Sequence, residues 1–209
     1  MSSAPADGPV RRPVRGIILA GGRSTRFGGV HKPGVQVEGI PVLARIHTAL
    51  TAVHVDGIWV AGPLDGLPDD LRPTVREVHE HPRFAGPLAG IAAAVADMPP
   101  DERAIILVLA GDVPYTDPAD LAHLVRTCAQ TGRTAASADA QGRRQHLCAA
   151  WPDALLRARL AAIGDPTDKP VRLLWEGVEP VLVAVSPASL EDFDTESDLR
   201  RITGDEPPR

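Results

Sequence analysis

The sequence predicts one α/β domain: a single three-layer, Rossmann-like fold, with helices on both faces of a mainly parallel sheet. Short apolar runs alternate with segments of helical period, as in repeated strand–helix units. Two of the runs, GIILA (16–20) and AIILVLA (104–110), are apolar on both faces, as buried central strands are. The length of 209 residues suits one compact core. We expect a domain over 15–203, with a flexible N-terminal extension (1–14) and a frayed tail (204–209).

The elements follow in order along the chain. Apolar runs predict strands at 16–20, 58–60, 75–78, 104–110 and 181–185. Apolar residues at helical spacing predict helices over 42–53 and, after the turn Asp117-Pro118, over 118–128. A short strand with a polar turn is expected within 133–142, a strand over 145–151 and helices over 152–163 and 195–202. The predicted helices would cover the two faces of the sheet.

Composition narrows the class of partner. The formal net charge of -5 argues against a nucleic-acid-coating protein, so small molecules are the expected ligands. No segment has the length of a membrane span and no signal peptide is evident, which predicts a cytoplasmic protein without a membrane partner. Cys128 and Cys148 have no metal-ligand spacing and are expected to pack as small hydrophobes.

A glycine-rich loop follows the first predicted strand, where open α/β sheets bind ligands. Its nucleotide-binding candidates come in two groups, the backbone of Leu19, Ala20, Gly21 and Gly22 and the side chains of Arg23, Ser24, Arg26 and Lys32. Glycines allow backbone N–H groups to approach phosphates, and the cations neutralise them. The spacing fits neither GxxxxGK[ST] nor GxGxxG. The alternative is a surface turn with solvated arginines, but Lys32 is one of only two lysines in the chain.

The motif LAGG-R-S-x-R-x-G-G-x-x-K resembles the nucleotide loop of the molybdenum cofactor guanylyltransferases, a branch of the MobA-like NTP transferases. Three further segments are similar to motifs of that family: GPLAGI at 86–91, GDVPY at 111–115 and DFDTESDL at 192–199. The resemblance spans 16–199 and implies nucleotide contacts from the second motif, by Gly86, Pro87, Leu88, Ala89 and Gly90. The chain departs from the family pattern at His31, where Asp is usual, and it contains no Asn.

Asp112 directly follows the predicted strand 104–110, so it is expected at the same crevice as the glycine loop. A carboxylate there suits Mg²⁺, which takes a few carboxylates together with phosphate oxygens and water. The alternative is an ordinary strand-end turn. Asp192 and Asp194 alternate along a short extended segment and are further candidate ligands, although Asp194 can equally cap the helix that follows.

The resemblance implies transfer of GMP from GTP to molybdopterin with release of pyrophosphate, and proteins of the molybdenum cofactor pathway as possible partners. Lys32, Arg26 and Asp112 would carry the chemistry. The implied acceptor residues are Gln145, His146, Lys169 and Arg172, each of which could instead be ordinary surface. Alternatives are another base or acceptor (cytidylyl transfer to molybdopterin, sugar-phosphate nucleotidylation) or a catalytically silent nucleotide-binding paralogue. Gly21 favours guanine, because guanylyl relatives tend to have LAGG and cytidylyl relatives LAAG.

Overall fold

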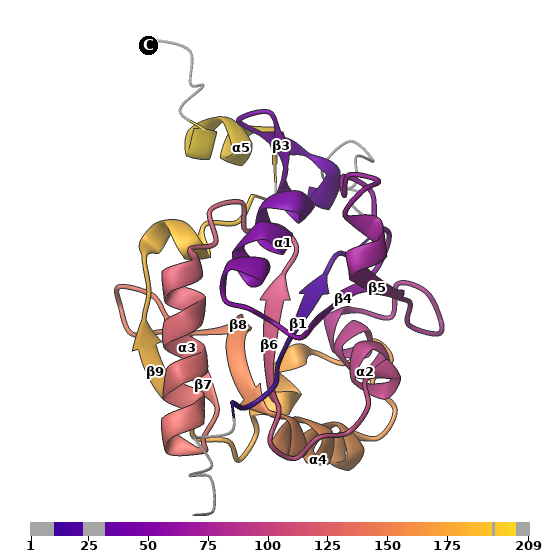
Figure 1. The fold of residues 1–209 in the computed structure, drawn as a ribbon, viewed down its shortest axis with the longest axis vertical. Helices are drawn as coiled ribbons and strands as arrows, with labels where there is room; N and C mark the ends of the chain where they lie inside the picture. The colour runs from indigo at the N-terminus through magenta and orange to yellow at the C-terminus, as the bar shows by residue number, and fades with distance from the viewer. Residues whose placement is uncertain (1–10, 23–31, 194, 204–209) are drawn as a thin grey trace, which may run out of the picture.

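A computed structural model of the chain describes residues 11–22, 32–193 and 195–203. Its centre is a seven-stranded sheet with the strand order β5-β4-β1-β6-β8-β7-β9 (Figure 1). The strands are β1 (Val14–Leu19), β4 (Gly57–Ala61), β5 (Val75–Val78), β6 (Ile105–Ala110), β7 (Ala135–Ala138), β8 (Arg144–Pro152) and β9 (Val181–Ala184).

Strand direction divides the sheet into two parts. β1 lies between β4 and β6 and is parallel to both, and β5 is parallel to β4. β8 runs antiparallel to β6 and to β7, and β9 is again parallel to β7. The expectation of a mainly parallel sheet is confirmed. The four strands β5, β4, β1 and β6 therefore present their carboxyl ends at one edge of the sheet.

Helices cover both faces. α1 (Val42–Ala52) and α3 (Pro118–Thr131) pack on one face, and α2 (Pro87–Asp97) and α4 (Asp153–Ile163) pack on the other (Figure 1). Asp117 caps α3 by accepting a hydrogen bond from the N–H of Ala119 (2.8 Å), as the Asp117-Pro118 turn predicts. α5 (Glu196–Thr203) ends the described chain, one residue later at each end than expected.

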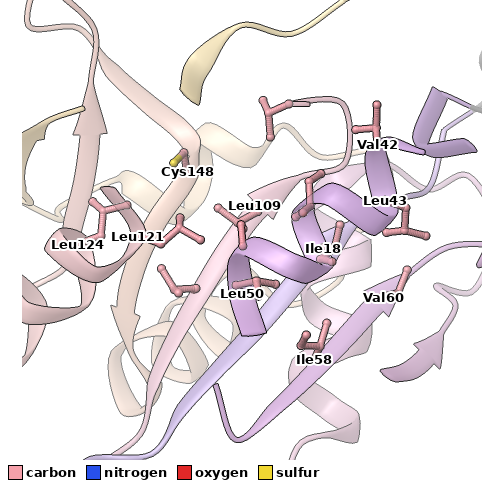
Figure 2. Close-up of a cluster of buried hydrophobic side chains, with 14 of the residues drawn as sticks. Ile18, Val42, Leu43, Leu50, Ile58, Val60, Leu109, Leu121, Leu124 and Cys148 are labelled. Atoms are coloured by element: carbon pink, nitrogen blue, oxygen red, sulfur yellow. The ribbon is translucent and has the colours of Figure 1, made fainter. Parts of the chain in front are cut away.

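The core forms two layers because side chains alternate along the central strands. On β1, Ile18 faces the layer of α1 and α3, whereas Ile17 faces the layer of α2 and α4. Figure 2 shows the first layer, where Ile18 lies beside Leu43 and Leu50 of α1 and Leu109 of β6. The side chains that the central strands contribute to the two layers are almost fully buried. The sheet is therefore a rigid support for the loops at its edge.

Both cysteines are buried, and they are free thiols. Burial raises the pKa of Cys128 to about 12 and that of Cys148 to about 11. The expectation that they pack as small hydrophobes agrees with this environment.

Some features differ from the sequence prediction. β1 begins at Val14, inside the range expected as a flexible extension, because the N–H of Val14 donates to the carboxylate of Asp56 (2.7 Å) and the carbonyl of Pro13 accepts from Ile105 (2.8 Å). A two-stranded ribbon of β2 (Gln36–Val37) and β3 (Ile40–Pro41) was not expected, nor were the 3-10 helices η1 (Lys32–Gly34), η2 (Arg72–Thr74) and η4 (Pro187–Leu190). Such short pieces lack a hydrophobic period that the sequence could display.

Candidate nucleotide site

The glycine loop leaves β1 between the ends of two neighbouring strands. The N–H of Ala20 donates to the carbonyl of Ala61 at the end of β4 (2.9 Å). A Cβ atom at Gly62 would lie 2.4 Å from the nitrogen of Gly21, and one at Gly111, after β6, would lie 2.5 Å from the oxygen of Leu19. Both distances are too short for a side chain. The loop backbone is therefore held between two glycines that follow β4 and β6.

A cavity of about 220 Å³ opens beside this loop. It brings together the first two motifs singled out in the sequence, since residues 19–22 supply one wall and residues 86–90 another. Its lining residues are Leu19, Gly21, Gly22, Ala61, Glu80, Phe84, Gly86, Pro87 and Gly90. Most of this surface is apolar or backbone, which suits the flat ring of a nucleotide base.

The start of α2 closes one side of the cavity. Gly86 is the N-cap with φ +93, a left-handed conformation that favours glycine, and Pro87 follows in the first turn. No side chain caps this end, so the first amides of α2 and its dipole are available to an anion. Leu88 and Ala89 are buried in the core, so only their backbone can contribute to binding. A Cβ at Gly90 would lie 3.3 Å from both Ala61 and Leu19, which explains the glycine there.

Glu80 is a cavity residue that sequence reasoning missed. Its side chain is 9 % exposed, and its Oε1 accepts a hydrogen bond from the N–H of Phe84 (2.9 Å). It lies 3.8 Å from the position of a Cβ at Gly21. Burying a carboxylate in a cavity that is otherwise apolar costs free energy unless a hydrogen-bond donor or a cation pairs with it. Its position two residues after a predicted parallel strand is the signal that could have drawn attention to it.

Asp112 lies at the far side of the loop, directly after β6, as predicted. The preceding Gly111 contacts the backbone of Leu19, so Asp112 stands next to the glycine loop. Residues 186–190 pack on the segment that follows Asp112, because the Ser189 hydroxyl donates to Asp120 (2.7 Å) and accepts from the N–H of Asp117 (3.0 Å). Asp192 follows this packed segment by two residues and is exposed.

The described part of the chain contains no group of three or more His, Cys, Asp or Glu residues placed to hold a metal ion. Mg²⁺ usually binds through one or two carboxylates and completes its shell with substrate phosphates and water. The single carboxylate of Asp112 meets that minimum. Asp194, Arg23, Ser24 and Arg26 lie outside the described residues, and Lys32 begins η1.

The first half of β8 extends the edge beyond the glycine loop. β8 runs antiparallel to β6, and Cys148 is its first residue along the chain that pairs with β6, opposite Leu109. The β8 residues before Cys148 therefore extend toward and past the carboxyl end of β6. The guanidinium carbon of Arg144 lies 4.5 Å from the ring centroid of Trp175, and the ring of His146 meets Trp175 edge-on at 5.8 Å. Burial, and then the charge of Arg144, lowers the pKa of His146. Sequence reasoning singled out His146 but neither Arg144 nor Trp175.

The remaining acceptor candidates are spread over this end. Gln145 is half-buried on β8 beside His146, and Arg172 is exposed in η3 (Val171–Trp175). The Nζ of Lys169 donates a hydrogen bond to the carbonyl of Ile163 at the end of α4 (3.0 Å). A cation at that position stabilises the last turn of the helix.

Among the described helices, none combines the length and apolar character needed to cross a membrane.

Comparisons with known proteins agree with this geometry. The sequence profile of the MobA-like NTP transferase domain matches residues 16–203. The molybdenum cofactor guanylyltransferases of Rhizobium johnstonii and Acidiphilium cryptum are each 32% identical, over 86% and 89% of this chain and 84% and 92% of their own lengths. A match to the probable molybdenum cofactor guanylyltransferase of Natronomonas pharaonis, 37% identical, spans 52% of this chain and 54% of that protein.

Solved structures support the fold. A nucleotidyl transferase from Methanothermobacter thermautotroptrophicus superposes with a TM-score of 0.73 at 24% identity, covering 93% of this chain and 98% of that one. The molybdopterin-guanine dinucleotide biosynthesis protein A of Archaeoglobus fulgidus has a TM-score of 0.67 at 18% identity, with 91% and 97% covered. With the profile match over residues 16–203 and relatives aligned over most of the chain, this protein belongs to the MobA-like NTP transferase family and is a nucleotidyltransferase.

Proposed function

We propose that this protein transfers GMP from GTP to molybdopterin and releases pyrophosphate. The observation that carries the proposal is the glycine loop held between Gly62 and Gly111, with a base-sized cavity on one side and Asp112 on the other. Relatives that align over most of the chain are named molybdenum cofactor guanylyltransferases. Proteins of the molybdenum cofactor pathway are the corresponding partners, and the cytoplasm is the corresponding compartment.

The strand order gives the nucleotide a direction across the edge. Glu80 follows β5, Gly21 follows β1 and Asp112 follows β6, and these strands lie in the order β5-β4-β1-β6. The base therefore belongs in the cavity beside Glu80, with the phosphates over the loop amides toward Asp112. Guanine presents adjacent N–H donors on its pairing edge, which a buried carboxylate can accept together. A base without that pair would leave Glu80 unpaired, at a cost of about 1–3 kcal/mol.

The reaction requires positioning and charge compensation more than proton transfer. The terminal phosphate of the acceptor is already ionised at neutral pH, so it can attack the α-phosphorus of GTP in line without a general base. The loop amides orient the triphosphate, and Lys32 and Arg26 offset the charge that develops on the leaving pyrophosphate. Asp112, with Asp192 or Asp194, would hold Mg²⁺, which when bound neutralises phosphate oxygens.

The acceptor belongs at the β8 end of the edge. Gln145, His146 and Arg172 remain the candidate contacts, and Arg144 with Trp175 adds a cationic and aromatic surface there. Such a surface suits an acceptor that combines a flat ring system with a phosphate. Lys169 positions the loop between α4 and η3 through its bond to Ile163, instead of contacting the acceptor phosphate.

The proposal is tested by measuring pyrophosphate release with GTP, CTP or ATP against molybdopterin and a sugar 1-phosphate. We expect turnover with GTP and molybdopterin, loss of turnover in Lys32→Ala with normal thermal unfolding, and partial recovery in Lys32→Arg. Higher kcat/KM with CTP would support cytidylyl transfer instead. Nucleotide binding without pyrophosphate release from any acceptor would support the silent paralogue, and full activity in Lys32→Ala would overturn the loop assignment.

A further inference from the structure

Phe84 lies at the mouth of the nucleotide cavity. It is one of three large hydrophobic residues that are exposed in the described part of the chain, with 49 % of its surface accessible, and it lines the cavity together with Glu80 and Pro87. The other two, Ile40 and Leu182, do not line it. Of these three exposed apolar side chains, Phe84 is therefore the one that borders the nucleotide cavity.

The backbone of Phe84 is held in an unfavourable conformation. Its φ is +65, in the left-handed region that bulky side chains rarely adopt. Its N–H donates to Oε1 of the buried Glu80 (2.9 Å), and the carbonyl of the next residue, Ala85, accepts from the N–H of Asp168 (2.9 Å). The surrounding chain thus fixes a conformation that glycine would adopt without strain. Such strain persists at sites where the side chain has a use.

The two residues that meet through this hydrogen bond offer different kinds of contact. A carboxylate can accept up to about four hydrogen bonds, so the bond from Phe84 leaves Glu80 with capacity for ligand donors. Glu80 can contact only the edge of a flat ring, because its oxygens accept hydrogen bonds. The phenyl ring of Phe84 has no hydrogen-bonding group, so it contacts a base by stacking or by van der Waals packing.

We infer that Phe84 is a positioning residue for the nucleotide, whose ring covers one face of the base while Glu80 accepts hydrogen bonds from its edge. This inference rests on the proposed function and adds to it a contact made by this chain's own Phe84. The hydrogen bond from the main-chain N–H of Phe84 holds its backbone beside the carboxylate of Glu80, so that both side chains can act on the same base. Stacking depends on the area of the base, so it favours a purine over a pyrimidine.

The decisive variant is Phe84→Gly. Glycine accepts φ +65 without strain, so we expect its thermal unfolding temperature to equal or exceed that of the wild type. Loss of the ring should weaken equilibrium binding of GTP by about 10-fold or more, the range found when an aromatic stacking partner is removed. Phe84→Tyr, which retains the ring, should bind GTP within about 3-fold of the wild type.

Two controls separate this role from others. Ribose 5′-triphosphate, which has the phosphates but no base, should bind equally to the wild type and to Phe84→Gly. Leu182→Ala removes an apolar side chain of equal exposure on β9, at the opposite edge of the sheet, and should leave GTP binding unchanged.

Unchanged GTP binding by Phe84→Gly would overturn the inference while leaving the proposed function intact. Equal weakening of GTP and ribose 5′-triphosphate would also overturn it, because the ring would then act on the loop and not on the base. A wild type that binds neither GTP nor another nucleoside triphosphate would refute the proposed function and, with it, the role of Phe84. A wild type that transfers GMP, combined with selective loss of GTP binding in the variant, would support both.

Discussion

The sheet edge that we propose as the active site is built differently at its two ends. At the end formed by β5, β4, β1 and β6, four parallel strands deliver backbone to one place, and the features that shape the site are glycines: Gly21, Gly62, Gly86 and Gly111. At the end formed by β8 and η3, side chains make the surface, with Arg144 and His146 on Trp175. This difference explains why the β5–β6 end, the proposed nucleotide half, carries sequence motifs, whereas the β8–η3 end, the proposed acceptor half, does not. Backbone geometry restricts residue type at fixed spacing, whereas a side-chain surface can be assembled from distant positions.

The largest effect should come from the proposed nucleotide half, at the carboxylate of Asp112, which we propose faces the phosphates. Asp112→Asn keeps the size of the side chain and removes its charge. We expect pyrophosphate release to slow by roughly 10²-fold or more, the cost of removing a preorganised charge contact, with GTP binding in the absence of metal much less affected. Asp69→Asn is the control, because the Asp69 side chain is 97 % exposed and pairs with Arg72. A metal located away from Asp112 in a nucleotide complex would contradict the assignment.

The next effect tests whether backbone packing shapes the loop. Gly111→Ala would place a Cβ 2.5 Å from the oxygen of Leu19, so either the loop or the end of β6 must shift. We expect the free energy of unfolding to fall by about 1–3 kcal/mol, as for other overpacked sites, and kcat/KM for GTP to fall by about 10-fold or more. Chemical denaturation and steady-state kinetics measure the two. Wild-type stability and activity would show that the loop is not held between Gly62 and Gly111.

The same contrast explains what the sequence could predict. Hydrophobic period predicted the central strands and the helices α1, α3 and α4, but not α2. The spacing after the first strand led to Leu19–Gly22 and Asp112, because these features are local. Glu80 and Phe84 escaped prediction because their importance depends on a contact between them and on a cavity formed with the first strand's loop. Strand β8 was expected, but its antiparallel pairing with β6 and the stacking of Arg144 on a tryptophan 31 positions later have no local signal.

The base preference provides a finer test of the nucleotide half. A Cβ at Gly21 would lie 3.4 Å from the carbonyl of Ala61 and 3.8 Å from Oε1 of Glu80, which are ordinary contacts. Gly21→Ala should therefore fold with nearly wild-type stability, in contrast to Gly111→Ala. The added methyl group lies beside the carboxylate that would read guanine, so we expect the preference for GTP over CTP to narrow by about 10-fold or to reverse. Measuring kcat/KM for both nucleotides decides this, and an unchanged ratio would contradict the proposed position of the base.

The smallest effect belongs to the acceptor half and separates two roles for its cations. Lys169→Met keeps the aliphatic stem but removes the donor to the carbonyl of Ile163, so we expect unfolding to become easier by about 0.5–1 kcal/mol, or a few degrees in Tm. The KM for the acceptor should stay within about 2-fold, because in this structure the ammonium is engaged with α4. Arg172→Met, at an exposed position of η3, should show the opposite pattern: unchanged Tm and a raised KM for the acceptor. If Lys169→Met instead raised that KM with no change in Tm, Lys169 would contact the acceptor phosphate.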